Sequence, residues 1–205
     1  EESAKFNNSD AFNNLGYLYY KGYGVEQNYK QAKEYYEEAA KLNNSDAFFN
    51  LGILYYKGQG VEQNYQMAKK YFELAAKYND SKAFIVLGDL YLEGKGVELN
   101  YSVARDYYEL AANLNNSDAF LHLGQLYQEG LGVKQDYLKA KEFYKLAIKH
   151  NNSKALYLIG YLYSACMKNY KKAVKYFKLS AQQNNQLAFS SLGNSYYYGL
   201  GVEKS

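Results

Sequence analysis

The stretch KGYGVEQNY, residues 21–29, decides the fold because it returns three more times at a constant spacing. It recurs as KGQGVEQNY at 57, EGKGVELNY at 93 and EGLGVKQDY at 129, each 36 residues further on. Two glycines one residue apart fit either a loop that cradles a phosphate or a tight turn between two helices. A phosphate site is needed once, so four near-identical copies indicate a structural joint in a repeated unit.

The segments on both sides of this turn repeat with it. SDAFNNLGYLYY at 9 becomes SDAFFNLGILYY at 45, SKAFIVLGDLYL at 81, SDAFLHLGQLYQ at 117 and SKALYLIGYLYS at 153. Ala11, Leu15 and Leu18 stand at i, i+4 and i+7, which is the spacing of one helix face. The segment after the turn has helical spacing too. Each repeat is therefore predicted to contain a helix A (9–21 in the first repeat), the turn and a helix B (29–42).

The period divides the chain into a single array. Repeats are expected at 9–44, 45–80, 81–116, 117–152 and 153–185, with a partial repeat at 186–205 and the tail of a preceding repeat at 1–8. Because AKFNN at 4–8 matches AKLNN at 40–44 and the sequence stops in a turn, we expect an excerpt of a longer protein. Repeat five is three residues shorter and has SACMKNY in place of the glycine turn. This change is either a tolerated deletion or a change of curvature or contact.

Residues at the ends and in the middle of helix A indicate how the repeat is held together. In the NNS that precedes helix A, an asparagine suits a left-handed helix cap and the serine suits the N-cap. A glycine inside helix A, Gly16 in the first repeat, costs about 0.5–1 kcal/mol relative to alanine. We expect close backbone approach of a neighbouring helix to offset that cost, with Tyr19 and Tyr36 filling the space between the helices.

Composition excludes several classes of function. The chain has 205 residues, 48% of them hydrophobic, a net charge of +3 and a single cysteine, Cys166. It can bury a continuous core but has no disulfide framework, and no apolar run approaches the ~20 residues of a membrane span. His122, His150 and Cys166 lack the spacing of metal ligands or of a nucleophile and its base. We therefore expect no catalytic residue, no metal and no cofactor, and predict that the chain is not an enzyme.

The repeated unit, A-x-x-x-L-G-x-L-Y, then G-x-G-V, then Y-x-x-A-x-x-Y-x-x-A-A, closely resembles the Sel-1-like repeat, a relative of the tetratricopeptide repeat. The resemblance covers nearly the whole chain. It implies an all-α, right-handed α-solenoid (superhelix) of antiparallel helix pairs, with helix A lining the concave surface, and an adaptor that assembles protein complexes. Two features depart from the family. The paired cysteines of its secreted bacterial branch are missing, and its frequent proline after G-x-G-V is replaced by Glu26, Glu62, Glu98 and Lys134.

Binding residues are expected in helix A at the places that the repeated framework leaves free. These are the third, fourth, seventh and tenth places after the Asp10 position, most of them roughly opposite the face of Ala11, Leu15 and Leu18. The resemblance puts them in a groove that would hold a partner protein or peptide. The predicted groove residues are Asn13, Tyr17, Tyr20, Phe49, Ile53, Tyr56, Ile85, Asp89, His122, Gln125 and Tyr161. One alternative stays open: the third-place column of Phe49, Ile85, Leu121 and Tyr157 would pack against the next repeat instead.

A second candidate surface is basic. No acidic residue lies between Glu142 and Glu203, whereas that span holds eight lysines. The predicted basic patch lies on helix B of repeat five and consists of Lys168, Lys171, Lys172, Lys175 and Lys178. It is either a solvated face or a site for an acidic protein segment, a nucleic acid or an anionic surface. Nucleic acid is disfavoured, because repeats one to four lack a basic track.

Two further alternatives concern context. An N-x-S triplet occurs once per repeat and is explained by helix-end chemistry, although it is also compatible with glycosylation in a secretory lumen. These triplets begin at Asn7, Asn43, Asn79, Asn115 and Asn151, with another at Asn100. The chain is alternatively an accessory domain of an enzyme whose catalytic part lies elsewhere. The sequence does not specify the partner, the compartment or the oligomeric state.

Overall fold

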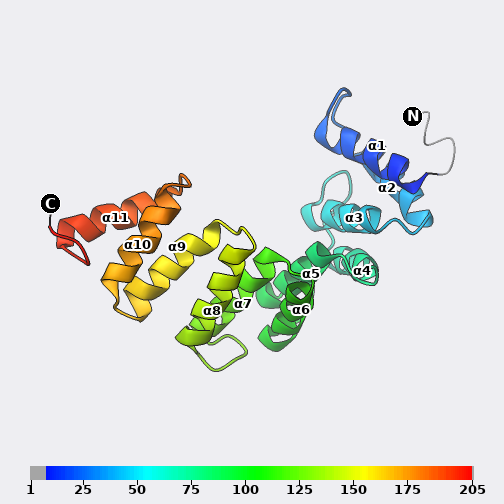
Figure 1. The fold of residues 1–205 in the computed structure, drawn as a ribbon. Helices are drawn as coiled ribbons and strands as arrows, with labels where there is room; N and C mark the ends of the chain where they lie inside the picture. Colours follow the sequence, from blue (N-terminus) through cyan, green and yellow to red (C-terminus); the bar gives the residue numbers. More distant parts are fainter. Residues whose placement is uncertain (1–7, 205) are drawn as a thin grey trace. The chain divides into compact units, whose positions relative to one another are not determined.

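The structure is a computed structural model that describes residues 8–204, and this part of the chain is all-α (Figure 1). The predicted repeat tail at 1–8 and Asn7 therefore lie outside the described residues, apart from Asn8. The helices are α1 (Ser9–Lys21), α2 (Tyr29–Lys41), α3 (Ser45–Lys57), α4 (Tyr65–Ala76), α5 (Ser81–Glu93), α6 (Tyr101–Asn113), α7 (Ser117–Glu129), α8 (Tyr137–Lys149), α9 (Lys154–Tyr161), α10 (Tyr170–Ala181) and α11 (Gln186–Tyr198). A π-helical turn, η2 (Leu162–Cys166), extends α9. No helix within these residues is long and apolar enough to cross a membrane.

The odd-numbered helices are copies of helix A, and the even-numbered helices are copies of helix B. The chain divides into two compact units, one ending at Leu110 and the other beginning at Ala111, and each is described separately. In the first unit α1 packs on α2 and α3 on α4, and in the second α7 packs on α8 and α9 on α10. Helix A of the first repeat is confirmed at 9–21, and helix B ends one residue before the predicted end. The predicted fold class, an all-α array of helix pairs, is confirmed.

Asparagine side chains hold the loop between repeats. Asn43 has a φ of 59°, as predicted for a left-handed cap. The N-cap of α3 is Asn44, whose Oδ1 accepts a hydrogen bond from Ala47 N at 2.9 Å. The predicted serine cap is wrong, because Ser45 is already the first helical residue. The amide of Asn44 also donates to Asp10 Oδ1 at 2.8 Å, so this cap joins two consecutive repeats.

The glycine inside helix A makes room for an aromatic ring of helix B. A Cβ placed on Gly52 would lie 2.5 Å from Phe72 Cε1, and one on Gly16 would lie 2.6 Å from Tyr36 Cδ1. Both rings are buried, which confirms the prediction that Tyr36 is a core residue, whereas Tyr19 is half-buried. The expectation of close backbone approach holds only in part, since a Cβ on Gly16 would also lie 3.1 Å from the backbone oxygen of Ala32 on helix B. The nearest atoms belong to a ring, because the ring occupies the space that a side chain on helix A would fill.

The glycine turn is a joint between repeats. Gly22 and Gly24 have φ angles of 73° and 72°, in the left-handed region that glycine adopts without strain. In the second repeat, a Cβ on Gly60 would lie 2.7 Å from the carbonyl carbon of Tyr29 at the start of α2. The turn of one repeat therefore packs tightly on the preceding repeat, and a side chain at its second glycine would separate the two.

Repeat five makes the same connection with a shorter turn. In the first repeat, Asn28 N donates to Tyr19 O at 2.9 Å, and in repeat five Asn169 N donates to Tyr163 O at 2.7 Å. Helix α9 continues into the π-helical turn, and Lys168, with a φ of 53°, reverses the chain before α10. The backbone bond that ties helix B to the end of helix A therefore survives the deletion.

The apolar face of helix A packs on the helix B that precedes it. Leu51 and Leu54 are fully buried and cluster with Ala32 and Tyr36 of α2. Leu18 occupies the place of Leu54 in the first repeat, but it is 37% exposed. Within the described residues, the face is thus buried where a preceding helix B covers it. In the second unit, one core cluster consists of Ala140, Tyr144, Ile159, Leu162, Tyr163, Ala173 and Phe177.

Candidate functional site on the helix A face

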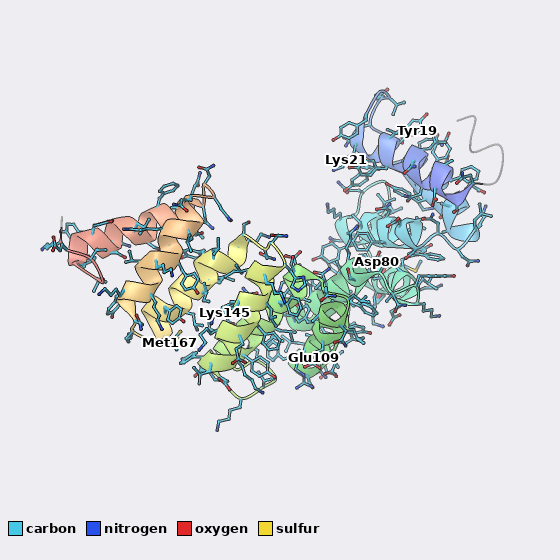
Figure 2. The ribbon with its side chains drawn as sticks, in the orientation of Figure 1. Tyr19, Lys21, Asp80, Glu109, Lys145 and Met167 are labelled. Carbon is cyan, nitrogen blue, oxygen red and sulfur yellow. The ribbon has the colours of Figure 1, made fainter. Side chains whose placement is uncertain are left out.

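In the first unit, Tyr17 is the exposed member of the predicted groove residues, with 43% of its surface accessible. Its ring meets Tyr23 edge-on at a centroid distance of 6.2 Å. Lys21, labelled in Figure 2, is the last residue of α1. Its Nζ lies 5.7 Å from the ring centroid of Tyr17 and 5.5 Å from that of Tyr20. A cation beside two rings gives this end of α1 a surface that is both aromatic and positively charged.

Tyr20 and Tyr56, at the tenth place, bridge consecutive repeats. The Tyr20 hydroxyl donates to Gln59 Oε1 at 3.1 Å, and Lys95 Nζ donates to the Tyr56 hydroxyl at 3.0 Å. Gln59 and Lys95 each stand between the two glycines of the turn in the next repeat. Both tyrosines are half-buried, so they serve the joint between repeats and present only part of their surface outward.

The third-place column packs inward in this unit. Phe49 is half-buried, with its ring centroid 5.5 Å from that of Phe72, and Ile85 is only 9% exposed. Asn50 Nδ2 donates to Asn13 Oδ1 at 2.9 Å, which links the first two repeats. The burial of these positions favours packing within the chain, but the ring that Phe49 contacts belongs to helix B of its own repeat, so packing against the next repeat stays a prediction.

At the seventh place, Ile53 and Asp89 are half-buried. Ile53 packs against the core of the first unit. Asp89 accepts a hydrogen bond from the Tyr108 hydroxyl at 2.7 Å. Burial and the nearby carboxylate both raise the pKa of that hydroxyl above its ordinary value. Asp89 therefore already has a partner within the chain.

In the second unit, the seventh-place residues are Gln125, which is half-buried, and Tyr161, which is 45% exposed. His122 is half-buried as well. Tyr161 lies on the wall of a hollow of about 340 Å³ between α9 and α11. Ser164 and Asn194 form other parts of its wall. A hollow of this size reaches the lower end of the range of small-molecule pockets, about 300–1,000 Å³.

The α11 side of this hollow was missed by the sequence prediction. Asn194, Tyr198 and Leu200 line it, and none of them is among the predicted groove residues. The signal was present, because alignment of the partial repeat puts Asn194 at the seventh place, where Tyr17 and Tyr161 stand. A larger hollow, of about 510 Å³, lies in the first unit between α4 and the turn after α5, and polar and charged side chains dominate its lining.

The five lysines of the predicted basic patch lie on the surface, but Lys168 precedes α10, so only the other four lie on helix B of repeat five. All five lysines are exposed, and within residues 8–204 none of them has an acidic partner within ion-pairing distance. Lys172 Nζ lies 5.4 Å from the ring centroid of Tyr163, and Lys178 Nζ lies 5.8 Å from that of Tyr196. In the first unit, by contrast, Lys33 on helix B pairs with Glu37 at 2.5 Å.

His150 and Cys166, the remaining candidate chemical residues of the sequence, lie in structural positions. His150 caps the C-terminus of α8, and its ring lies 5.2 Å from that of Phe120. Cys166 is a free, half-buried thiol. In the part of the chain that the structure describes, no three His, Cys, Asp or Glu side chains are placed to hold a metal ion.

Helix pairs that repeat along the chain and pack on their neighbours define the class of α-solenoid repeat proteins. The family model described as the Sel1 repeat matches residues 9–44, 45–80, 85–116, 118–152, 153–185 and 190–205. The chain belongs to the Sel1 repeat family. Proteins of this family typically are non-catalytic scaffolds that mediate protein interactions.

Several solved structures are similar to this chain. A Sel1 repeat protein from Oxalobacter formigenes is 34% identical, with a TM-score of 0.87 over 98% of this chain and 83% of that one. A protective antigen of uropathogenic Escherichia coli with an SLR fold is 29% identical, with a TM-score of 0.90 over 100% of this chain. This chain spans 44% of that antigen's length. Cysteine-rich protein B of Helicobacter pylori is 28% identical, with a TM-score of 0.50 over 64% of this chain and 94% of that one. Comparison with the curated proteins gave no significant match.

Proposed function

We propose that the chain is an adaptor that binds a segment of a partner protein on the helix A face. The observation that carries the proposal is the exposed Tyr161 on the wall of the hollow between α9 and α11. Tyrosine supplies a large contact area with little loss of rotamer freedom, and it is enriched among residues that dominate binding energy. Tyr17 presents a second exposed ring at the same place of the repeat.

The remaining predicted groove residues take a supporting part in this proposal. Tyr20, Tyr56 and Asp89 are held by hydrogen bonds within the chain, so they would present a rigid surface beside the exposed rings. A surface already fixed before binding loses less entropy when a partner is bound. Ile85 is buried and would contribute packing rather than contact.

The test is selection of binding peptides from a random display library, followed by affinity measurement with purified variants. Tyr161→Ala is compared with Tyr78→Ala, since Tyr78 is 50% exposed, lies just beyond α4 and is not a predicted groove residue, its ring being stacked on that of Phe48 at 6.0 Å. We expect Tyr161→Ala to weaken binding of the selected peptides by about 2 kcal/mol, roughly 30-fold, and Tyr78→Ala to leave it unchanged. Equal affinity for both variants, with both folded by circular dichroism, would refute the assignment to helix A.

A second candidate function rests on the basic patch. Its five exposed lysines have no acidic partner within the described residues, so the patch has an uncompensated positive charge. We propose that it binds an acidic protein segment. Nucleic acid is less favoured because the chain has a single arginine, Arg105, and arginine is the usual residue for bidentate phosphate contacts. Binding of an acidic peptide should fall steeply with salt and be lost when Lys171, Lys172 and Lys175 are replaced by glutamate. Unchanged binding would refute this candidate.

A further inference from the structure

The hollow between α9 and α11 corresponds to a place that the chain's own tyrosines fill in the first unit. Tyr20 and Tyr56 are the tenth-place residues of repeats one and two. The hydroxyl of each is hydrogen-bonded to the residue between the two glycines of the next repeat's turn. The partner atoms are Gln59 Oε1 at 3.1 Å and Lys95 Nζ at 3.0 Å. In both repeats, a phenol ring therefore occupies the space between the end of helix A and the glycine turn of the next repeat.

In repeat five, the two corresponding residues are Ser164 and Leu200. Both line the hollow of about 340 Å³. A serine has no ring to place between helix A and the following turn, so the space stays open. Repeats three and four have Leu92 and Gln128 at this place, so repeat five has the smallest tenth-place side chain of the five, and the hollow lies beside it.

The turn itself sits as it does in the first unit. A Cβ on Gly201 would lie 2.5 Å from the carbonyl carbon of Tyr170, and the corresponding distance from Gly60 to Tyr29 is 2.7 Å. The second glycine of the turn is therefore packed equally closely on the start of the preceding helix B. The glycine turn is therefore placed alike in both, whereas helix A differs, since Ser164 lies in the π-helical turn η2 and Tyr20 lies in the regular helix α1. Ser164 also lacks the ring that Tyr20 carries.

We propose that this hollow is a subsite for an aromatic side chain of the bound protein segment. The inference rests on the proposed function and names the chemistry of one part of the ligand. Aromatic walls are present in Tyr161, Tyr198 and Phe177, which suit edge-on or offset ring contacts. Ser164 and Asn194 add polar groups that can hydrogen-bond a phenol hydroxyl. The occupant would take the place that Tyr20 holds within the chain.

The test titrates the isotope-labelled chain with N-acetyl-L-tyrosinamide, and separately with N-acetyl-L-leucinamide, while amide resonances are followed by NMR. We expect the tyrosine probe to shift the amides of Ser164, Ser191 and Asn194 with a Kd on the order of millimolar, and the leucine probe to bind several-fold more weakly. Ser164→Tyr should abolish the shifts, since the chain then fills its own hollow. Asn194→Tyr serves as a second filling variant, because the seventh place holds tyrosine in repeats one and five.

Each outcome bears on one proposal or the other. The subsite is refuted if neither probe shifts those amides at tens of millimolar, if leucine binds as well as tyrosine, or if both filling variants, folded by their NMR dispersion, still bind the tyrosine probe. Peptide binding that depends on Tyr161, together with absent probe binding, refutes the subsite and leaves the adaptor function standing. Probe binding without any selected peptide supports the subsite and refutes the proposed function.

Discussion

Alanine in place of the helix A glycine should have opposite effects at two equivalent positions. Gly52 is buried against Phe72, and a Cβ there would lie 2.5, 2.7 and 2.9 Å from three ring carbons. Gly193 stands at the same place in the partial repeat, and a Cβ there meets nothing within 4 Å in the described residues. The helix backbone and the substitution are the same in both cases, so the difference isolates the contact with the ring.

The magnitudes follow from two opposing terms. Replacing a mid-helix glycine by alanine stabilises a helix by about 1 kcal/mol. Forcing an additional carbon into a packed core destabilises by about 1–3 kcal/mol, and Phe72 is fully buried, so its ring cannot move into solvent. We therefore expect Gly193→Ala to stabilise the chain by up to about 1 kcal/mol and Gly52→Ala to destabilise it by roughly 1 kcal/mol.

The assay is equilibrium unfolding in urea, followed by far-ultraviolet circular dichroism. With a urea dependence of about 3 kcal/mol per molar, the midpoint should fall by roughly 0.3 M for Gly52→Ala and rise for Gly193→Ala. In a Phe72→Leu background, which lacks the ring, the penalty of Gly52→Ala should shrink. The reasoning is refuted if Gly52→Ala raises the midpoint as Gly193→Ala does, or if its penalty is unchanged without the ring.

Three more predictions concern stability. Burial raises the pKa of the Tyr36 hydroxyl from its ordinary value of 10.0. The free energy of unfolding linked to this hydroxyl is therefore full below pH 10 and falls as the pH rises towards the pKa of the folded state. In urea titrations above pH 10, Tyr36→Phe should make the fall in the free energy of unfolding shallower by about 1.4 kcal/mol per pH unit. Ser180 is fully buried and its hydroxyl has no hydrogen-bond partner among the described residues, so Ser180→Ala should raise the thermal midpoint by an amount equivalent to about 1 kcal/mol, and a lower midpoint would contradict this. Asn44→Ala removes both a helix cap and the hydrogen bond to Asp10, so it should lower the free energy of unfolding by about 1–2 kcal/mol in thermal unfolding. A loss below about 0.5 kcal/mol would show that the hydrogen bond between the two repeats contributes nothing.

The repeat period allowed the helices to be predicted, because each residue is compared with its equivalents and errors in one copy are corrected by the others. Helix A of the first repeat was placed correctly from the spacing of Ala11, Leu15 and Leu18. The period does not show what a position contacts. Ile53 and Ile85 are equally apolar in sequence, but Ile85 is buried and Ile53 is half-buried, since they stand at different places of the helix.

The candidate site was predicted less completely than the fold. Tyr161 was identified because it varies against the framework, but the hollow beside it depends on a ring that is missing at Ser164 and on a wall from the partial repeat. A missing side chain has meaning only when the contact that it makes elsewhere is known. The Tyr20 to Gln59 hydrogen bond supplies that knowledge, and the structure was needed to show it.

The shortened connection of repeat five shows which part of the repeat can change length. The hydrogen bond from Asn169 N to Tyr163 O closes a loop three residues shorter than the one from Asn28 N to Tyr19 O, and the helices on both sides still pair. Because the ends of the loop are fixed by this bond, segments of other lengths can be inserted between them at a small entropic cost. The connection of repeat five, which lacks the glycine turn, is thus a natural attachment point, at which an engineered loop can be added while α9 and α10 stay paired.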